Sequence, residues 1–160
     1  MLKYAVKLSP KGAVFIARFE GFAAKPYNDA NGYATIGYGH LLHYSRVSKA
    51  DLERFPHDLT KEQGLQYLRA DAQIAAHAVS EYIHVKLKQN QMDGLISFTY
   101  NCGAGSLNGT TVQRCVNTLN WKALPSALRM WTHDGHGNEL QGLVSRRLAE
   151  SNLILRGIYA

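Results

Sequence analysis

Two carboxylates near the N-terminus stand in settings that could tune them differently. Glu20 ends a short segment with helical periodicity, and Asp29 opens a segment rich in glycine and tyrosine nine positions later. Thr35 follows, with a hydroxyl group suited to holding a water molecule. Cleavage of a glycosidic bond needs a carboxylic acid that protonates the leaving oxygen and a carboxylate that activates water or stabilises the sugar cation. The three residues make glycoside hydrolysis a hypothesis, although each is ordinary alone.

A helix is expected to carry Glu20. Ser9 followed by Pro10 is typical of a helix start, with a capping side chain and then proline at the first helical position. Apolar residues follow at 14, 15, 16 and 19. Glu20 is predicted to lie in the last turn, with Gly21 ending the helix.

Asp29 and Thr35 fall in a segment of different character. Residues 23–43 are punctuated by glycine and proline between tyrosines and an isoleucine. This pattern predicts short antiparallel strands, with Asn31-Gly32 as a tight hairpin turn.

From Thr60 onward the chain has helical periodicity. Thr60 and Gln63 predict a capping box, and apolar residues keep a spacing of three or four up to 83. If unbroken, this helix is about 36 Å long at 1.5 Å per residue, long enough to bridge two lobes. Further helical patterns run near 87–100, 111–119, 121–131 and 140–155.

These elements predict an α+β, mainly helical fold in one domain spanning 1–160. The expected small β-containing lobe covers about 20–58, and the larger helical lobe covers about 60–160 together with the first helix, 9–20. A cleft between lobes is the default place for a ligand.

The residues around Glu20, taken as one string, resemble the phage-type lysozymes (endolysins) of glycoside hydrolase family 24. The resemblance covers nearly the whole chain and is carried by Glu20-Gly21, Tyr27-Asn28-Asp29, Gly32, Thr35-Ile36-Gly37-Tyr38-Gly39-His40, Ser97-Phe98-Thr99-Tyr100-Asn101, Trp131, Gly142-Leu143, Arg146-Arg147 and Glu150. It implies a lysozyme-like fold with an active-site cleft. It also implies a muramidase without a cofactor that hydrolyses the β-1,4 bond between N-acetylmuramic acid and N-acetylglucosamine in bacterial peptidoglycan.

The resemblance also implies roles for single residues. Glu20 is expected to be the general acid, and Asp29 to position or activate the attacking water or to shield positive charge on the sugar. Thr35 is expected to help hold that water. A threonine beside Asp29 suggests a water opposite the acid, and hence inversion at the anomeric carbon.

Supporting residues are implied with alternatives left open. Asn101 is expected near Glu20, as is either Arg146 or Arg147; the alternative for each arginine is a solvated helix face or a pair with Glu150. His40 is expected to pair with Asp71 across the lobes.

The tyrosines of the hairpin segment allow two interpretations. Tyr27, Tyr33 and Tyr38 could stack on sugars or could equally pack the hairpin.

Composition limits the other classes of function. The chain has 160 residues, with 46% apolar and 19% charged residues, which excludes a disordered tail, a collagen and a coiled coil. A net charge of +6 favours anionic partners. The basic residues are scattered and no zinc-finger or RNA-recognition signature is present, which favours an anionic cell envelope over nucleic acid.

Cysteine and histidine usage points to neither disulfides nor a metal. Cys102 and Cys115 form no disulfide framework and are interpreted as buried thiols. The histidine pairs at 40 and 43 and at 133 and 136 lack the third ligand of a zinc peptidase or amidase.

No apolar run approaches the ~18 residues of a membrane span, and no signal-peptide core is recognised. We therefore expect synthesis in the host bacterial cytoplasm, no stable membrane insertion, and a monomer. Some relatives carry an N-terminal membrane-anchoring helix. Without one, release to the wall is expected to depend on a separate holin.

Two rival functions stay open. A lytic transglycosylase cuts the same bond but closes an anhydro ring without water, and Asp29 as a second carboxylate favours hydrolysis. An inactive wall-binding module is the rival from another class, and the presence of Glu20, Asp29 and Thr35 argues against it.

Overall fold

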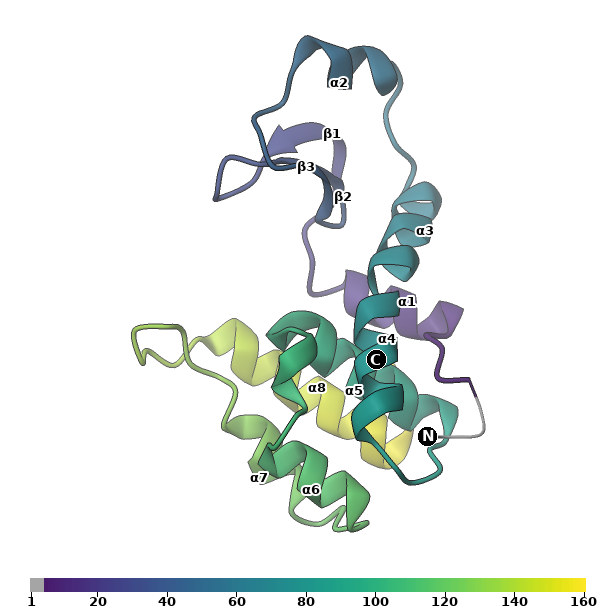
Figure 1. The fold of residues 1–160 in the computed structure, drawn as a ribbon, viewed down its shortest axis with the longest axis vertical. Helices are drawn as coiled ribbons and strands as arrows, with labels where there is room; N and C mark the ends of the chain where they lie inside the picture. The colour runs from purple at the N-terminus through teal and green to yellow at the C-terminus, as the bar shows by residue number, and fades with distance from the viewer. Residues whose placement is uncertain (1–4) are drawn as a thin grey trace. The chain divides into compact units, whose positions relative to one another are not determined.

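The structure of this chain is a computed structural model that describes residues 5–160. The described residues divide into two compact units, Ala13–Asp71 and residues 5–12 with Ala72–Ala160, which we call the sheet unit and the helical unit. Helix α1 (Pro10–Ala17) crosses the boundary after Gly12 (Figure 1). The sheet unit is thus larger than the lobe expected over 20–58, because it includes most of α1 and the helix that follows Thr60.

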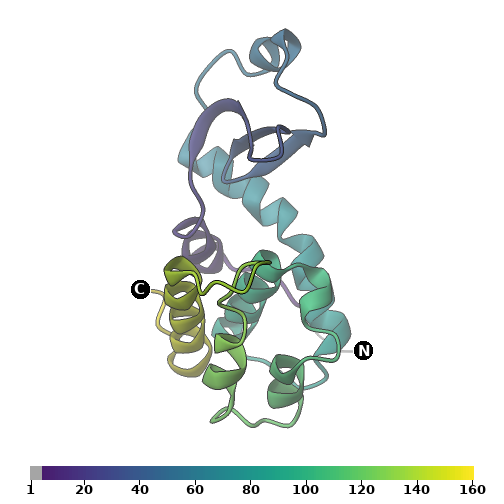
Figure 2. The same cartoon turned by 90° about the vertical axis from the view of Figure 1, so that its left-hand side faces the viewer.

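The sheet unit contains the predicted antiparallel strands. β1 (Ala23–Asn28), β2 (Ala34–Gly37) and β3 (His40–His43) form one sheet in the order β1-β2-β3. The central strand β2 is buried along its whole length. Helix α3 (Lys61–Asp71) contacts β2 and β3, and Figure 2 shows it running beside the sheet.

The connection between β1 and β2 is longer than the predicted two-residue turn. Asn28 pairs with Ala34, so the loop comprises residues 29–33. The N–H of Asp29 donates to the carbonyl of Tyr33 at 2.9 Å, and the N–H of Gly32 donates to the carbonyl of Asp29 at 2.9 Å. Gly32 has φ of 82°, a left-handed conformation that glycine adopts without a steric penalty. Asn31-Gly32 therefore marks the turn correctly but not its length.

The first helix begins as predicted and ends early. The Ser9 hydroxyl accepts a hydrogen bond from the N–H of Gly12 at 3.0 Å, and Pro10 is the first helical residue. The helix ends at Ala17, and the N–H of Glu20 then donates to the Ala17 carbonyl at 3.2 Å in a tighter turn. The prediction that Glu20 lies in the last helical turn is wrong. The N–H groups of Phe19 and Glu20 each donate to the carbonyl three residues earlier instead of four, so the α-helix has ended before Glu20.

The long helix expected from Thr60 is interrupted. Its capping box is confirmed, since the N–H of Thr60 donates to Gln63 Oε1 at 2.9 Å and the N–H of Gln63 donates to Thr60 Oγ1 at 3.2 Å. The segment forms α3 and then α4 (Gln73–Tyr82), separated at Ala72. The boundary between the two units falls at the same place.

A short helix in the sheet unit was not predicted. α2 (Lys49–Arg54) begins with a capping box between Ser48 and Asp51. At six residues it is too short for apolar periodicity to reveal it.

The helical unit contains the remaining predicted helices. Their bounds are α5 (Gln89–Cys102), α6 (Thr111–Asn117), α7 (Leu124–Arg129) and α8 (Gln141–Arg156), with a 3-10 helix η1 (Ala104–Ser106) after α5. α5 is buried from Met92 to Thr99 and packs on α4 and α8. A Cβ at Gly94 would clash with the side chain of Ile154 on α8, so glycine is needed for this close packing.

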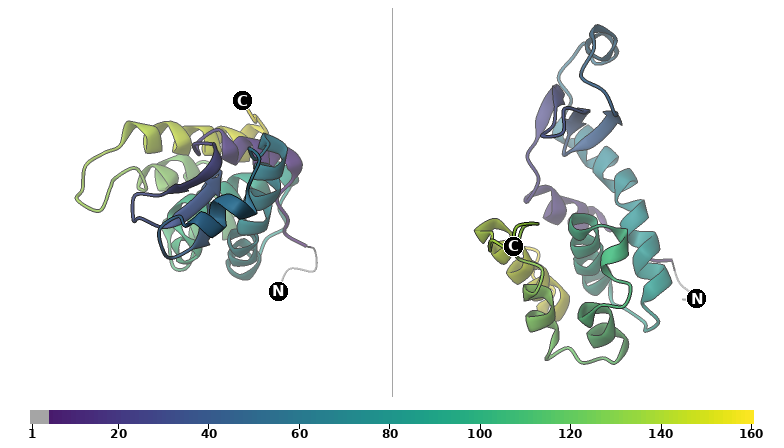
Figure 3. Two further views of the ribbon diagram at one scale, coloured as in Figure 1. Left: turned by 90° about the horizontal axis from the view of Figure 1, so that it is seen from above. Right: turned by 60° about the vertical axis from the view of Figure 1, so that its left-hand side comes forward.

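The connection between α7 and α8 stands out from the rest of the helical unit (Figure 3, left panel). It is closed by a single bridge between His133 and Glu139. Among residues 5–160, no helix combines the length and the apolar character needed to span a bilayer.

Candidate active site

Glu20 lies on the turn that links α1 to β1 and is partly exposed. Two shallow hollows of the sheet unit share it. The first, of about 300 Å³, is lined by Glu20, Gly21, Phe22, Ala23, Tyr27 and Gly39. The second, of about 310 Å³, is lined by Val14, Ala17, Arg18, Glu20, Phe22, Tyr38, Lys61 and Leu65. Glu20 therefore forms part of the wall of both surface depressions.

Asp29 organises the β1–β2 loop through one carboxylate oxygen. Asp29 Oδ1 accepts hydrogen bonds from the N–H of Asn31 at 2.8 Å and from the N–H of Tyr33 at 2.9 Å. Among residues 5–160, Asp29 Oδ2 has no hydrogen-bond donor. The carboxylate is thus fixed in orientation by the backbone while its second oxygen stays available.

Thr35 lies on the central strand and is only 3% exposed. Its backbone pairs with Tyr27 on β1 and with Leu41 on β3. The Thr35 hydroxyl donates to the Tyr33 carbonyl at 3.1 Å. Because the hydroxyl proton is used in that bond, Thr35 Oγ1 can interact with a water only by accepting a hydrogen bond from it.

Tyr27 connects the two carboxylates electrostatically. It lines the first hollow and is 38% exposed. Burial raises the pKa of Tyr27, and the negative charges of Asp29 and then Glu20 raise it further. The phenol therefore lies within electrostatic range of both carboxylates and stays protonated at neutral pH. From the sequence, Tyr27 is expected either to stack on sugars or to pack the hairpin. Its place two residues before Asp29 is the sequence signal for its closeness to that carboxylate.

The other two tyrosines differ in setting. Tyr38 is 9% exposed, and its ring centroid lies 4.9 Å from that of Phe22. It is a packing residue. Tyr33 is partly exposed and meets the ring of Tyr44 edge to face, with centroids 5.4 Å apart. Sugar stacking by Tyr33 stays a prediction.

His40 pairs with Asp71 as expected. Its Nδ1 lies 3.0 Å from both carboxylate oxygens of Asp71, and its ring stacks on Tyr67 with centroids 4.4 Å apart. Both partners belong to the sheet unit. The pairing thus joins β3 to the end of α3 within one unit, and the prediction that it crosses between lobes is wrong.

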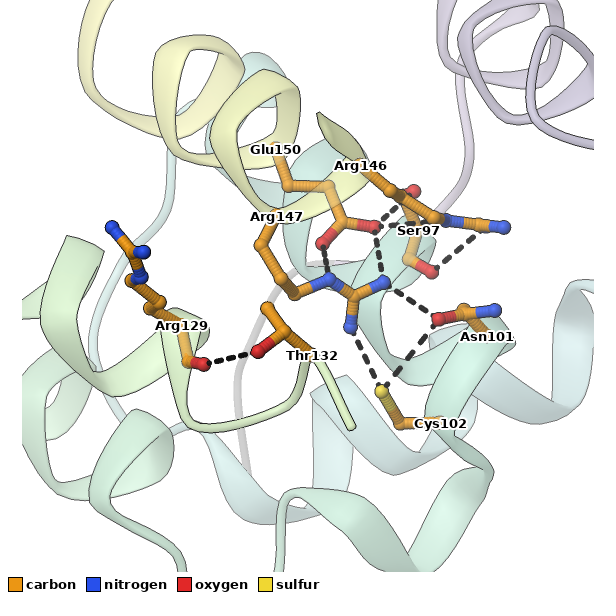
Figure 4. A network of polar contacts seen from close by, with 8 residues as sticks. All are labelled: Ser97, Asn101, Cys102, Arg129, Thr132, Arg146, Arg147 and Glu150. Carbon is orange, nitrogen blue, oxygen red and sulfur yellow. Dashed lines mark hydrogen bonds and ion pairs between the residues drawn. The ribbon is translucent and has the colours of Figure 1, made fainter. Parts of the chain in front are cut away.

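The two arginines belong to a buried network in the helical unit, shown in Figure 4. Arg146 Nε lies 3.2 Å from Glu150 Oε1, and Arg147 Nε lies 3.0 Å from Glu150 Oε2. All three side chains are at most 3% exposed. Ser97 Oγ donates to Glu150 Oε1 at 2.7 Å. Burial raises the pKa of Glu150, and the charges of Arg147 and then Arg146 oppose that rise.

Asn101 and Cys102 complete this network. Arg147 Nη2 donates to Asn101 Oδ1 at 2.6 Å, and Arg147 Nη1 lies 2.9 Å from Cys102 Sγ (Figure 4). The pairing of both arginines with Glu150 matches the alternative left open for them. The expectation that Asn101 and one arginine lie near Glu20 joins residues of different units and stays a prediction.

Both cysteines are free thiols. Cys115 is buried as expected, whereas Cys102 is partly exposed. Burial raises the pKa of the Cys102 thiol, and Arg147 opposes the rise. Within the described part of the chain, no three His, Cys, Asp or Glu side chains are placed to hold a metal ion.

Comparisons with known proteins agree with the sequence pattern. The phage lysozyme family model matches residues 17–150. The endolysin of Salmonella phage P22 is 33% identical over 150 residues, covering 94% of this chain and 99% of that protein.

Solved structures show the same relationship at the level of the fold. The endolysin from Escherichia coli O157:H7 phage FAHEc1 superposes with a TM-score of 0.80 at 33% identity, covering 96% of each chain. A P22 lysozyme structure gives 0.78 at 32% identity, covering 93% of this chain and 98% of that one. Because the family model covers most of the sequence and these relatives match nearly end to end, the chain belongs to the phage lysozyme family.

Proposed function

We propose that this phage-type lysozyme hydrolyses the β-1,4 bond between N-acetylmuramic acid and N-acetylglucosamine with Glu20 as the general acid. The chain is a muramidase that degrades bacterial peptidoglycan, as its family membership establishes. The assignment of the chemistry to single residues rests on one observation: Glu20 lies on the wall of a hollow that Tyr27 also lines, and Asp29 is held by backbone N–H groups in the loop that follows Tyr27. This arrangement supports a glycosidase site in the sheet unit, with one carboxyl group in the hollow and a second in the neighbouring loop.

Glu20 protonates the glycosidic oxygen as the bond to the anomeric carbon breaks. Its position on the wall of a hollow supports this role, because the leaving oxygen must come within hydrogen-bond distance of the acid. Tyr27 lines the same hollow and presents a protonated phenol there.

Asp29 holds and activates the attacking water. Its Oδ1 is occupied by two backbone N–H groups, so Oδ2 is the oxygen that accepts a proton from water. Thr35 Oγ1 accepts the second hydrogen bond of that water, which leaves a water lone pair for the anomeric carbon. Attack from the face opposite the leaving group inverts the configuration, and inverting enzymes keep their carboxyl groups about 6.5–9.5 Å apart.

The first test is turbidity loss of bacteria stripped of their outer membrane. We expect Glu20→Gln to lower the rate of clearing by roughly 10²–10⁴-fold, the usual contribution of a general acid. The matched control is Glu81→Gln, a half-exposed glutamate of α4 beside His77, which should clear at the wild-type rate. More than a few per cent of activity in folded Glu20→Gln would remove Glu20 from the acid role.

Product analysis separates the remaining alternatives. NMR in the first seconds of digestion should show the α-anomer at the new reducing end, and a β-anomer would exclude inversion. Mass spectrometry should show products that have gained one water. Anhydro products would identify a lytic transglycosylase, and wall pelleting without lysis would identify a binding module.

The proposal also covers the route by which the enzyme reaches the cell wall and its oligomeric state. The enzyme acts as a monomer and leaves the host cytoplasm through a separate holin. The likeness to endolysins supports this route. Expression with and without a holin should give lysis only with it, and light scattering should give a mass of 17.8 kDa.

A further inference from the structure

A serine, a histidine and an aspartate line up at the end of strand β3, in a part of the sheet unit that the muramidase chemistry does not use. Ser45 Oγ lies 2.8 Å from His43 Nδ1. On the other side of the ring, His43 Nε2 lies 3.0 Å from both carboxylate oxygens of Asp51. These contacts connect a hydroxyl, an imidazole and a carboxylate in the order that activates a serine nucleophile.

The protonation states that fit these contacts are the ones that activation needs. Asp51 accepts a hydrogen bond from the His43 Nε2–H, so Nδ1 carries the lone pair that accepts the Ser45 hydroxyl proton. The N–H and hydroxyl of Ser48 also donate to Asp51 Oδ2, each at 2.7 Å. They hold the carboxylate in place and, with His43, lower the pKa of Asp51 to about 2. Asp51 therefore stays ionised and can stabilise an imidazolium at His43.

Backbone donors for an oxyanion stand next to the serine. Among the described residues, the N–H groups of Ser45 and Arg46 have no hydrogen-bond acceptor. The N–H of Val47, by contrast, is bound by Asn28 Oδ1 at 2.7 Å. Two successive amides with free protons at a nucleophile are the groups that stabilise a tetrahedral intermediate.

The surroundings of Ser45 define the substrate class. Ser45 is exposed, and Tyr44 before it is 77% exposed. The ring of Tyr44 packs edge to face on Tyr33 of the Asp29 loop. An exposed nucleophile can accept a short acyl group, and an aromatic ring beside it can hold the ring of a sugar.

We propose that Ser45, His43 and Asp51 form an esterase site that removes acetyl groups from sugar hydroxyls. Ser45 Oγ attacks the ester carbonyl carbon as its proton moves to His43 Nδ1. The bond to the sugar oxygen then breaks, and that oxygen takes the proton from Nδ1. Water then attacks the acetyl carbonyl carbon as it loses a proton to Nδ1. The bond from that carbon to Ser45 Oγ breaks, Oγ takes the proton back from Nδ1, and acetic acid leaves. The sugar part of this substrate rests on the proposed muramidase function, whereas the acyl transfer does not.

The experiment compares p-nitrophenyl acetate hydrolysis by the full chain and its variants. Ser45→Ala and His43→Gln should each lower the enzyme-dependent rate about tenfold or more. Ser126→Ala removes another exposed serine and should not change the rate. Glu20→Gln should keep full ester hydrolysis while losing wall clearing, so failure of one activity is distinguishable from failure of the other. Circular dichroism checks that each variant is folded.

Two further readouts locate the chemistry. Diisopropyl fluorophosphate should label the peptide that contains Ser45 in the wild type and not in His43→Gln. Acetate release from a 6-O-acetylated N-acetylhexosamine tests the sugar assignment. Equal rates for wild type and Ser45→Ala, without a labelled peptide, would overturn the esterase site and leave these side chains with the role of holding residues 43–48. Hydrolysis of the phenyl ester alone would overturn the sugar substrate.

Discussion

At the scale of single residues, Glu150 shows how strongly a buried charge depends on its partners. It is fully buried between Arg146 and Arg147 on α8. Glu150→Gln should lower the free energy of unfolding by about 3–5 kcal/mol, because both guanidinium groups are left buried without an opposite charge. Urea unfolding of the purified variant measures this loss.

The control for Glu150 is a glutamate in an exposed pair. Glu53 lies 3.6 Å from Lys49 on α2, and its side chain is 67% exposed. Glu53→Gln should change the free energy of unfolding by less than about 1 kcal/mol. Equal effects of the two substitutions would show that the Glu150 network carries no special stability.

The sequence singles out Glu20, Asp29 and Thr35 because they stand close together in one short segment. Spacing alone suggests only a hypothesis; the resemblance to the phage-type lysozymes is what assigns them roles, and those roles remain proposals. The network around Arg147 could not be predicted in this way. Its partners Asn101 and Cys102 are 46 and 45 positions distant, and only the packing of α5 against α8 brings them together.

At the scale of elements, two loops in different units share one hydrogen-bond pattern. In residues 134–138, the N–H of Asp134 donates to the Asn138 carbonyl at 2.9 Å, and Asp134 Oδ1 accepts from the N–H groups of His136 and Asn138. The same bonds occur at the same positions in residues 29–33. In both loops the fourth residue is a glycine with positive φ, 82° at Gly32 and 86° at Gly137.

This likeness supplies a matched pair of substitutions. Gly32→Ala and Gly137→Ala should each cost about 1–2 kcal/mol of unfolding free energy, the price of a left-handed backbone with a Cβ. A Cβ added at either position would meet no atom within 4 Å, so the loss of stability comes from the backbone conformation and not from a clash. Wall clearing should fall more in Gly32→Ala, because that loop orients Asp29. Thermal or urea unfolding together with turbidity loss measures both effects. Equal losses of clearing would argue against a special role for the Asp29 loop.

The capping box of α2 predicts a dependence of stability on pH. Hydrogen bonds from Ser48, and then His43, lower the pKa of Asp51 to about 2. A lowered pKa stabilises the fold above the ordinary carboxyl pKa of about 3.9 and loses that contribution as pH falls through the folded value. The urea midpoint of Asp51→Asn should therefore lie below that of the wild type at pH 6. The difference between the two urea midpoints should become smaller between pH 4 and pH 2. A difference that is constant over this range would contradict a stabilising role of ionised Asp51.

Element boundaries were harder to predict than element types. Capping residues identified the starts of α1 and α3, since a side chain that accepts a backbone N–H acts locally. The end of α1 and the break at Ala72 carry no such signal, because neither Gly21 nor Ala72 has a left-handed backbone. These boundaries depend on how the chain packs, which local patterns do not encode.

At the scale of the whole molecule, one aspartate joins segments from both ends of the chain. Asp93 on α5 is fully buried and accepts hydrogen bonds from the N–H of Ser9 at 2.9 Å and from the Tyr159 hydroxyl at 2.7 Å. Burial and Asp93 raise the pKa of Tyr159 to about 12, so this phenol remains a donor. The helical unit is therefore closed by contacts that span the sequence, which explains why it includes the N-terminal segment.

The charge of the whole molecule predicts how the enzyme finds its substrate. The chain carries 18 lysines and arginines against 12 aspartates and glutamates, and these charges are scattered rather than gathered in a nucleic-acid motif. Attraction to an anionic cell wall acts over about 30 Å at 10 mM ionic strength and about 10 Å at 100 mM. Wall clearing at low enzyme concentration should therefore slow as salt is raised across this range, through a slower encounter rather than slower chemistry.

A neutral substrate separates encounter from catalysis. Cleavage of uncharged N-acetylglucosamine oligomers should be nearly independent of salt over the same range, because no long-range attraction contributes to it. Lys122→Glu changes an exposed lysine outside the proposed sites and lowers the net charge from +6 to +4. It should weaken the salt dependence on walls and leave the oligomer rate unchanged. A wall-clearing rate that is flat in salt would mean that the positive charge does not guide encounter, and that local contacts alone determine binding to the wall.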